Sequence, residues 1–115
     1  MKQAGQIALT PFPYTDLTGA KLRPVLMLKK SSIYHDDWLV CMVSSQLQQA
    51  DPDLDEIITE ADDDFSASGL KVQSVLRLSR LAILSSNLMV GNLGQISSHR
   101  LSTVRKRLSQ WLLIE

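Results

Sequence analysis

Short apolar runs separated by polar turn residues dominate the first three quarters of the chain. Residues 6–10 alternate polar and apolar side chains and end at Pro11, which is typical of a half-buried strand. Residues 24–28 and 38–43 are continuously apolar, as expected for strands that are covered on both faces. Further strands are expected at 54–59, at 72–84 as one long or two joined strands, and at 88–90 and 93–96, whereas 65–69 is typical of a turn.

The last segment changes to a helical period. Its apolar residues recur every three or four positions, at Leu101, Val104, Leu108, Trp111 and Leu112. Ser97 or Ser98 can cap this helix. Its outer face is expected to be a solvated basic surface, formed by Arg100, Arg105, Lys106 and Arg107. The pattern therefore predicts a mainly β (α+β) fold, a small barrel of five to seven short antiparallel strands with a C-terminal helix. The 115 residues are expected to form a single domain, 1–115.

The charge distribution changes what the composition implies. Twelve Lys and Arg balance twelve Asp and Glu, and a net charge of zero argues against a nucleic-acid partner. However, eight of the acids lie between Asp51 and Asp64, where there is no basic residue. Residues 1–50 then carry a net charge of +2 and residues 71–115 a net charge of +6. The acidic segment has three interpretations: a solvated loop, which is the default, an electrostatic screen beside a binding groove, or a segment displaced on binding.

No feature of the sequence suggests export or a membrane. The single cysteine, Cys41, lies in the longest apolar run, residues 38–43, which is far too short to span a bilayer. One thiol makes no internal disulfide, and its apolar neighbours indicate an inert buried residue. The first six residues lack the apolar core of a signal peptide. We therefore expect a soluble cytoplasmic protein.

Generic motifs for metals, phosphates and serine hydrolases fail. Residues 51–62 begin like a calcium loop, but Glu56 stands where glycine is required and Asp62 where glutamate is required. The adjacent residues 35–37 are better explained as a turn than as metal ligands. There is no GxSxG elbow and no glycine-rich phosphate loop. No cofactor or metal is expected.

Several blocks, taken together, resemble the MazF/PemK family of toxin endoribonucleases. The opening GQIALTPFPYTDL, residues 5–17, runs into KLRPVL, residues 21–26. The likeness continues in VSSQ at 43–46, in GLK at 69–71 with SVLRL at 74–78, and in LGQIS at 93–97. The resemblance implies an SH3-like barrel that forms a homodimer. It also implies a toxin that cleaves single-stranded RNA sequence-selectively without metal and is held in check by a cognate antitoxin protein.

The resemblance also assigns roles to residues. Arg23 and Ser44 match the catalytic arginine and hydroxyl of the family, and a guanidinium fork suits a phosphate under attack by the neighbouring 2′-hydroxyl. Contacts to RNA are implied for Ser45 and Gln46, and for Ser74 and Arg77. Alternation along a strand places Ser74 and Arg77 on opposite faces, and Arg77 is the preferred of the two.

Two positions depart from the family pattern. Thr18 and Ser79 stand where the family often has acidic residues, and Asp16 is a candidate replacement for the first of them. Because an arginine is a poor general base, the residue that accepts the proton is not assigned. Tyr14 and Phe65 are the candidates for stacking on unpaired bases, while Trp38 is expected in the core.

Two alternatives to the ribonuclease remain open at this stage. One is a non-catalytic toxin on the same barrel that acts on a protein target such as a DNA topoisomerase. The other is a binding module that has lost its carboxylates and retains only RNA or partner binding.

Overall fold

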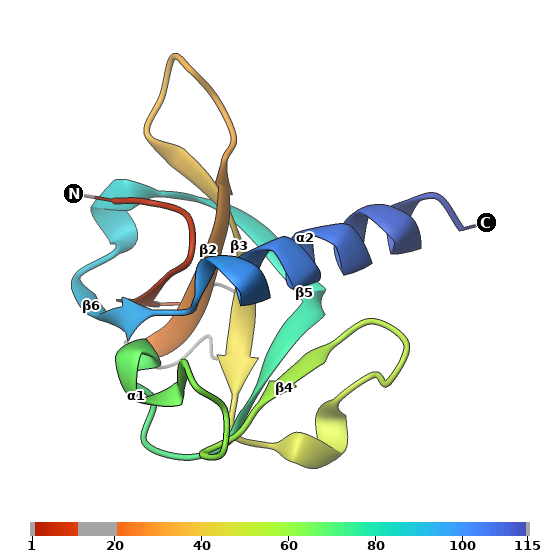
Figure 1. Ribbon diagram of the computed structural model, residues 1–115. Helices are drawn as coiled ribbons and strands as arrows, with labels where there is room; N and C mark the ends of the chain where they lie inside the picture. The colour runs from red at the N-terminus through yellow and green to blue at the C-terminus, as the bar shows by residue number, and fades with distance from the viewer. Residues whose placement is uncertain (1, 12–20, 115) are drawn as a thin grey trace.

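The chain folds into one curled antiparallel sheet with a helix across it (Figure 1). The computed structural model describes residues 2–11 and 21–114. The elements follow in the order β1 (Gln6–Thr10), β2 (Arg23–Lys30), β3 (Asp37–Ser44), η1 (Leu47–Gln49), β4 (Glu56–Ile58), α1 (Phe65–Ser68), β5 (Ser74–Ser85), η2 (Ser86–Leu88), β6 (Gly91–Gln95) and α2 (Ser98–Leu112). The strand order across the sheet is β4-β5-β3-β2-β1-β6. This arrangement confirms the predicted mainly β fold with a C-terminal helix.

Apolar residues cover both faces of the central strands, as the continuous runs in β2 and β3 predict. On one face, Leu26, Leu28 and Val43 pack with Val104 and Leu108 of α2. The opposite face carries a second apolar cluster, Ala8, Val25, Met27, Trp38, Val40, Met42, Leu84 and Met89. Trp38 and Cys41 are buried as expected. This two-sided burial fixes the register of β2 and β3, on which the positions of Arg23 and Ser44 depend.

β5 is one long strand with a shift in its pairing. Cys41 pairs with Leu81, but the next residue of β3, Met42, pairs with Arg77. Residues 78–80 therefore bulge out of the ladder and bend the strand, which curls the sheet. At the bulge, the Ser79 amide and hydroxyl donate to Oδ1 of the buried Asp55 at 3.0 and 3.1 Å.

Two sequence expectations for short elements differ from the structure. Residues 65–68, expected to be a turn, form the short helix α1, which ends at Gly69 with φ +76°. Residues 88–90, expected to be a strand, instead include the end of the 3-10 turn η2, where Ser85 Oγ accepts a hydrogen bond from the Asn87 amide. The leucine, methionine and valine there alternate in burial without pairing as a strand.

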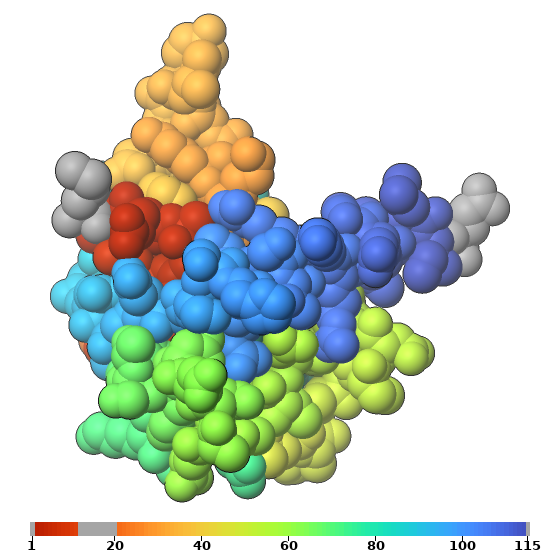
Figure 2. Space-filling view, viewed as in Figure 1, coloured from red at the N-terminus to blue at the C-terminus, as the bar shows by residue number. Residues whose placement is uncertain are grey.

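α2 begins where predicted but does not bury its whole apolar face. Ser97 is its N-cap, and its hydroxyl oxygen accepts from the Arg100 amide at 3.0 Å. The last turns extend past the sheet, so Trp111 and Leu112 are 43% and 65% exposed (Figure 1). Figure 2 shows this end of α2 and the tip of the β2–β3 hairpin as two separate projections. Neither helix of the described residues is long and apolar enough to cross a membrane.

Candidate active site

A pocket of about 440 Å³ lies where the start of β2 meets the end of β3. The chain segment before β5 and one residue of β6 complete its wall. Five of the site residues expected from the sequence line it, namely Arg23, Ser44, Ser45, Gln46 and Ser74. The fold thus brings together residues that are up to 51 positions apart, the separation of Arg23 and Ser74.

The charge of this pocket is positive. Lys21, Arg23 and Lys71 line it, and none of its described lining residues is acidic. Three cationic side chains around a concave surface without compensating carboxylates attract anions. A phosphodiester backbone fits this electrostatic character.

Arg23 has an unused hydrogen-bond donor inside the protein. It is the first residue of β2 and pairs with Thr10 of β1. The Arg23 Nε and the Thr10 hydroxyl are both buried and have no hydrogen-bond partner among the described residues. Thr10 itself is 0% exposed. Buried polar atoms are nearly always paired, so these two unpaired atoms are unusual, and of the two residues only Arg23 lines the pocket.

Ser44 is held at the end of β3 by a local turn. Its Oγ accepts a hydrogen bond from the Gln46 amide at 3.1 Å, a side-chain turn that ends the strand. The Ser44 hydroxyl proton has no acceptor among the described residues, so it can donate to a bound group. Val25 pairs with Met42, and two residues further along this register Arg23 lies beside Ser44 on the same face.

Arg77 and Ser74 occupy different surroundings. Arg77 pairs with Met42 and therefore shares the sheet face of Arg23 and Ser44, but it does not line the pocket. Its Nη1 donates to Gln49 Oε1 at 3.2 Å, and its Nε is buried without a partner. Ser74 is buried in the pocket wall, where its hydroxyl donates to the Val72 carbonyl at 2.9 Å. Ser74 therefore lines the pocket, whereas Arg77, the residue that the sequence favours for contact with RNA, does not.

The aromatic candidate that the structure describes lies apart from the pocket. Phe65, at the start of α1, packs partly buried against the core and is not a lining residue. The remaining candidates for contact with RNA, Tyr14, Asp16 and Thr18, lie outside the described residues.

Comparison with known proteins decides the family. A sequence model of PemK-like, MazF-like toxins of type II toxin–antitoxin systems matches residues 3–112. The chain belongs to this family. Among curated protein sequences there is no match.

Two solved structures have the same fold as this toxin. One is an endoribonuclease in complex with its cognate antitoxin from a mycobacterial species, with a TM-score of 0.67 and 14% identity over 100% of this chain and 98% of that one. The other is the Mycobacterium tuberculosis toxin MazF-mt6, with a TM-score of 0.68 and 12% identity over 96% of this chain and 98% of that one.

Two glycines allow the pocket wall of the toxin to form. A Cβ at Gly69 would overlap the Leu93 carbonyl oxygen, and a Cβ at Gly94 would overlap the Ala67 carbonyl oxygen. Only glycine lets α1 and β6 approach this closely. The contact places Leu93 beside residues 69–72, so that both segments line the pocket.

The acidic segment of the toxin is not the solvated loop expected by default. Arg100 of α2 contacts three of its carboxylates, at 3.2 Å to Glu56, 3.1 Å to Asp62 and 2.8 Å to Asp64. Burial by itself raises the pKa of Asp64, but hydrogen bonds from Arg100 and from the Ser97 amide outweigh it and leave that pKa below its ordinary value.

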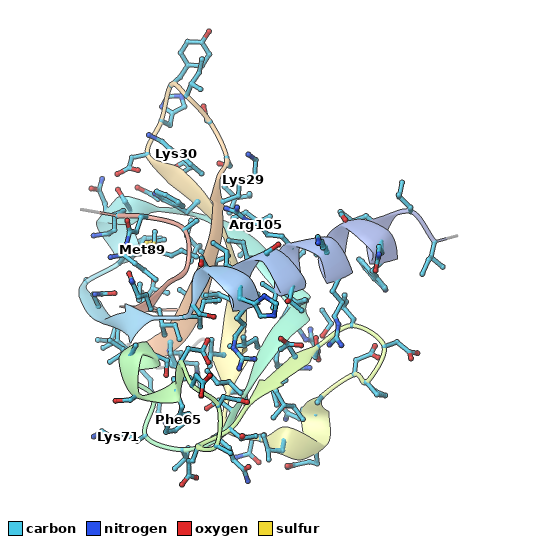
Figure 3. The ribbon with its side chains drawn as sticks, in the orientation of Figure 1. Lys29, Lys30, Phe65, Lys71, Met89 and Arg105 are labelled. Atoms are coloured by element: carbon cyan, nitrogen blue, oxygen red, sulfur yellow. The ribbon has the colours of Figure 1, made fainter. Side chains whose placement is uncertain are left out.

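The basic face of α2 is correspondingly different from the expected solvated surface. Arg105 donates from Nε and Nη2 to the Leu28 carbonyl at 2.9 and 2.6 Å, where α2 crosses β2 near Lys29 (Figure 3). Arg107 contacts Glu56 at 3.4 Å. A second hollow of about 560 Å³ surrounds Arg100, but its four acidic residues disfavour a phosphate ligand.

Two further residues are not predicted from the sequence: Lys71, which lines the pocket, and Thr10, which pairs with Arg23. Thr10 looks like an ordinary strand threonine, and only its burial without a hydrogen-bond partner distinguishes it. Lys71 belongs to a block that carries the family resemblance, three residues before Ser74, and this position was the available signal. Ser79 stands where the family can have an acidic residue, and its hydroxyl donates a hydrogen bond to the carboxylate of Asp55.

Proposed function

We propose that this toxin is an endoribonuclease that cleaves single-stranded mRNA sequence-selectively, without a metal ion, in the pocket around Arg23. The single observation that carries the proposal is that Arg23 lines one pocket together with Ser44 and with two further cations, Lys21 and Lys71. An arginine held in this way is ready to bind a phosphate. Family membership supports the same activity.

The reaction uses the 2′-hydroxyl of the RNA as nucleophile. Its oxygen attacks the adjacent phosphorus as its proton leaves for a base, and the bond from phosphorus to the 5′-oxygen breaks as that oxygen gains a proton. The products are a 2′,3′-cyclic phosphate and a 5′-hydroxyl. Arg23 stabilises the charge that accumulates on the phosphorane, and Ser44 donates its free hydroxyl proton to a phosphate oxygen.

The proton transfers need a group other than Arg23. The described lining residues of the pocket include neither a carboxylate nor a histidine. Asp16, Tyr14 and Thr18, in the segment that leads to Arg23, are assigned to contact with the RNA, and Asp16 is the carboxylate nearest to Arg23 in the sequence. Ser45, Gln46, Ser74 and Arg77 are assigned to RNA binding, and Phe65 to a flanking nucleotide beyond the pocket.

The partners proposed for the toxin follow from its family and its surface. A protein antitoxin that neutralises it is the partner expected of a type II system. We assign the contact of a homodimer to the apolar residues that follow α2, Leu113 and Ile114, which are 84% and 72% exposed. We place its action in the cytoplasm, where mRNA is accessible.

The activity is tested by incubating the purified protein with a long single-stranded RNA in excess EDTA and mapping the new 5′ ends. Discrete cuts are expected, and Arg23→Ala should reduce their rate by about 10²–10³-fold because it removes the main charge on the phosphorane. Lys106→Ala serves as control, since Lys106 is an exposed cation on α2 away from the pocket. RNA left intact by the wild-type protein, with growth arrest that persists in Arg23→Ala, would instead support a protein target.

A further inference from the structure

The pocket around Arg23 contains an exposed aliphatic surface as well as cations. Leu22, Val72 and Leu93 line it and are 44%, 51% and 37% exposed. They come from three separate parts of the fold: the residue before β2, the segment before β5, and β6. Apolar surface left in water inside a concave site is a feature of ligand pockets.

These three residues, here called the aliphatic ledge, lie among the cationic residues of the pocket. Leu22 stands between Lys21 and Arg23 in the chain, and Val72 follows Lys71. A nucleotide has the same combination, because a flat ring with apolar faces is joined to phosphates on both sides. Flipped or unpaired bases are held between apolar side chains as well as aromatic ones. None of the described residues that line the pocket is aromatic, so among them the ledge is the surface on which a base can pack.

Gln46 provides a group that can distinguish bases at this ledge. Its Oε1 accepts a hydrogen bond from Gln48 Nε2 at 2.8 Å, which orients the amide and leaves the Gln46 Nε2 as a donor. The side chain is exposed at the pocket and free to contact a base edge. Uracil and guanine present carbonyl acceptors where cytosine and adenine present amino donors.

We propose that the aliphatic ledge and Gln46 form a base subsite that selects a keto base, uracil or guanine, next to the phosphate bound by Arg23. The volume of about 440 Å³ lies in the range of about 300–1,000 Å³ typical of small-ligand pockets, which suits one nucleotide. The cleavage preference of the enzyme therefore originates at Gln46 for the identity of the base, and at the ledge for affinity without regard to identity. This inference rests on the proposed function, since it names the nucleotide that the same pocket reads.

The test of base selection uses Gln46→Glu. This change keeps the acceptor for Gln48 and replaces the amide donor with a carboxylate. Gln95→Glu is the matched control, because Gln95 Oε1 likewise accepts from a glutamine amide, that of Gln3 at 2.9 Å, and it does not line the pocket. Cuts in a random-sequence RNA are mapped for both variants. One position beside the wild-type cut should be enriched in U or G, and Gln46→Glu should lower that preference by about tenfold or turn it toward A and C.

The test of the ledge uses binding alone. Short 2′-O-methyl oligonucleotides cannot be cleaved by their own 2′-oxygen, so their affinity is measured by titration. Val72→Thr should weaken binding by about three- to tenfold for every base composition, and Val90→Thr, at a residue 64% exposed outside the pocket, should not.

The binding measurement also separates the inference from the proposed function. If no RNA is cut but the oligonucleotides bind with a U or G preference that Gln46→Glu removes, the base subsite stands and the nuclease does not. If RNA is cut and Gln46→Glu retains the wild-type base preference, the nuclease stands and the base subsite is refuted. Equal binding of all oligonucleotides by the wild-type protein refutes the subsite in either case.

Discussion

Arg100 and Asp64 form a two-pronged ion pair across 36 residues of sequence, from Nε to Oδ2 at 2.8 Å and from Nη2 to Oδ1 at 3.1 Å. The side chains of both residues are largely buried. The pair joins the acidic segment to the first turns of α2. Asp64 also accepts the Ser97 amide at 3.0 Å, so one carboxylate holds both the arginine and the residue that caps the helix.

Asp64→Asn should therefore destabilise the protein. Loss of the carboxylate leaves the largely buried arginine with Asp62 and Glu56 as its remaining ionic partners among the described residues. We therefore expect a decrease of about 1–3 kcal/mol in the free energy of unfolding. Urea denaturation measures this decrease. Asp63→Asn is the control, since Asp63 is exposed and should change stability by less than about 0.5 kcal/mol.

The same pair predicts a dependence of stability on acid pH. Arg100 and the Ser97 amide lower the pKa of Asp64, and the Thr59 amide lowers the pKa of Asp62. A carboxyl with a depressed pKa in the folded state contributes stability above its unfolded pKa, about 3.9, and that contribution disappears as the pH falls through the folded value. The stability difference between wild type and Asp64→Asn should be constant from about pH 5 to 7 and shrink below about pH 4. A difference that grows on acidification would contradict the assignment.

Thr10→Val should separate stability from activity. The buried Thr10 hydroxyl has no hydrogen-bond partner in the part of the chain that the structure describes, so its removal should raise the free energy of unfolding by about 1 kcal/mol. If that hydroxyl contacts the scissile phosphate beside Arg23, cleavage should fall by about tenfold. In Thr103→Val, where the hydroxyl already donates to the His99 carbonyl at 3.0 Å, no gain in stability is expected. Full cleavage by Thr10→Val would remove Thr10 from the site.

Gly94→Ala should damage the pocket wall. The new methyl group would overlap the Ala67 carbonyl oxygen, and we expect a loss of about 1–3 kcal/mol in stability together with weaker RNA binding. Gly91→Ala in the same strand is the matched control, because its Cβ would meet only the Leu9 side chain, at 3.4 Å. Thermal melts and RNA titrations of the two variants should differ clearly; similar behaviour would mean that the approach of α1 to β6 is not needed.

The acidic segment has an electrostatic effect that can be tested without disturbing its ion pairs. Glu60 and Asp63 are exposed, whereas Asp62 and Asp64 hold Arg100. Glu60→Gln with Asp63→Asn should tighten RNA binding by up to about threefold at low salt, and the effect should vanish at about 0.5 M salt. Unchanged affinity at low salt would show that these charges do not influence the pocket.

The sequence predicts the framework of this fold well because its main strands have strong apolar patterns. The runs at 24–28 and 38–43 become β2 and β3, and their ends carry Arg23 and Ser44 into one pocket. Residues 88–90 mislead the prediction, because three consecutive apolar residues are typical of a strand, whereas Leu88 ends the 3-10 turn η2 and Met89 is its C-cap. α1 has only four residues, fewer than a helical period needs to be visible.

Which charged residues pair with one another cannot be predicted from their neighbours in the sequence. Arg100 follows a helical period that places it on a polar face, and nothing near it in the chain indicates that Asp64 would cover it. The same holds for Thr10 and Arg23, whose missing partners are visible only after β1 and β2 are paired. Such features depend on tertiary burial, which periodicity does not report.

The contacts of α2 determine where the positive and negative charges of the toxin lie, although their sum is zero. The arginines of α2 cancel part of the acidic segment by direct contact, while Lys21 and Lys71 line the Arg23 pocket, whose described lining residues include no acid. The chain is therefore neutral in sum but polarised, with a cationic mouth on one side. This field should steer an approaching polyanion toward the pocket before contact. The association rate, more than the final affinity, should therefore depend on the separation of charge.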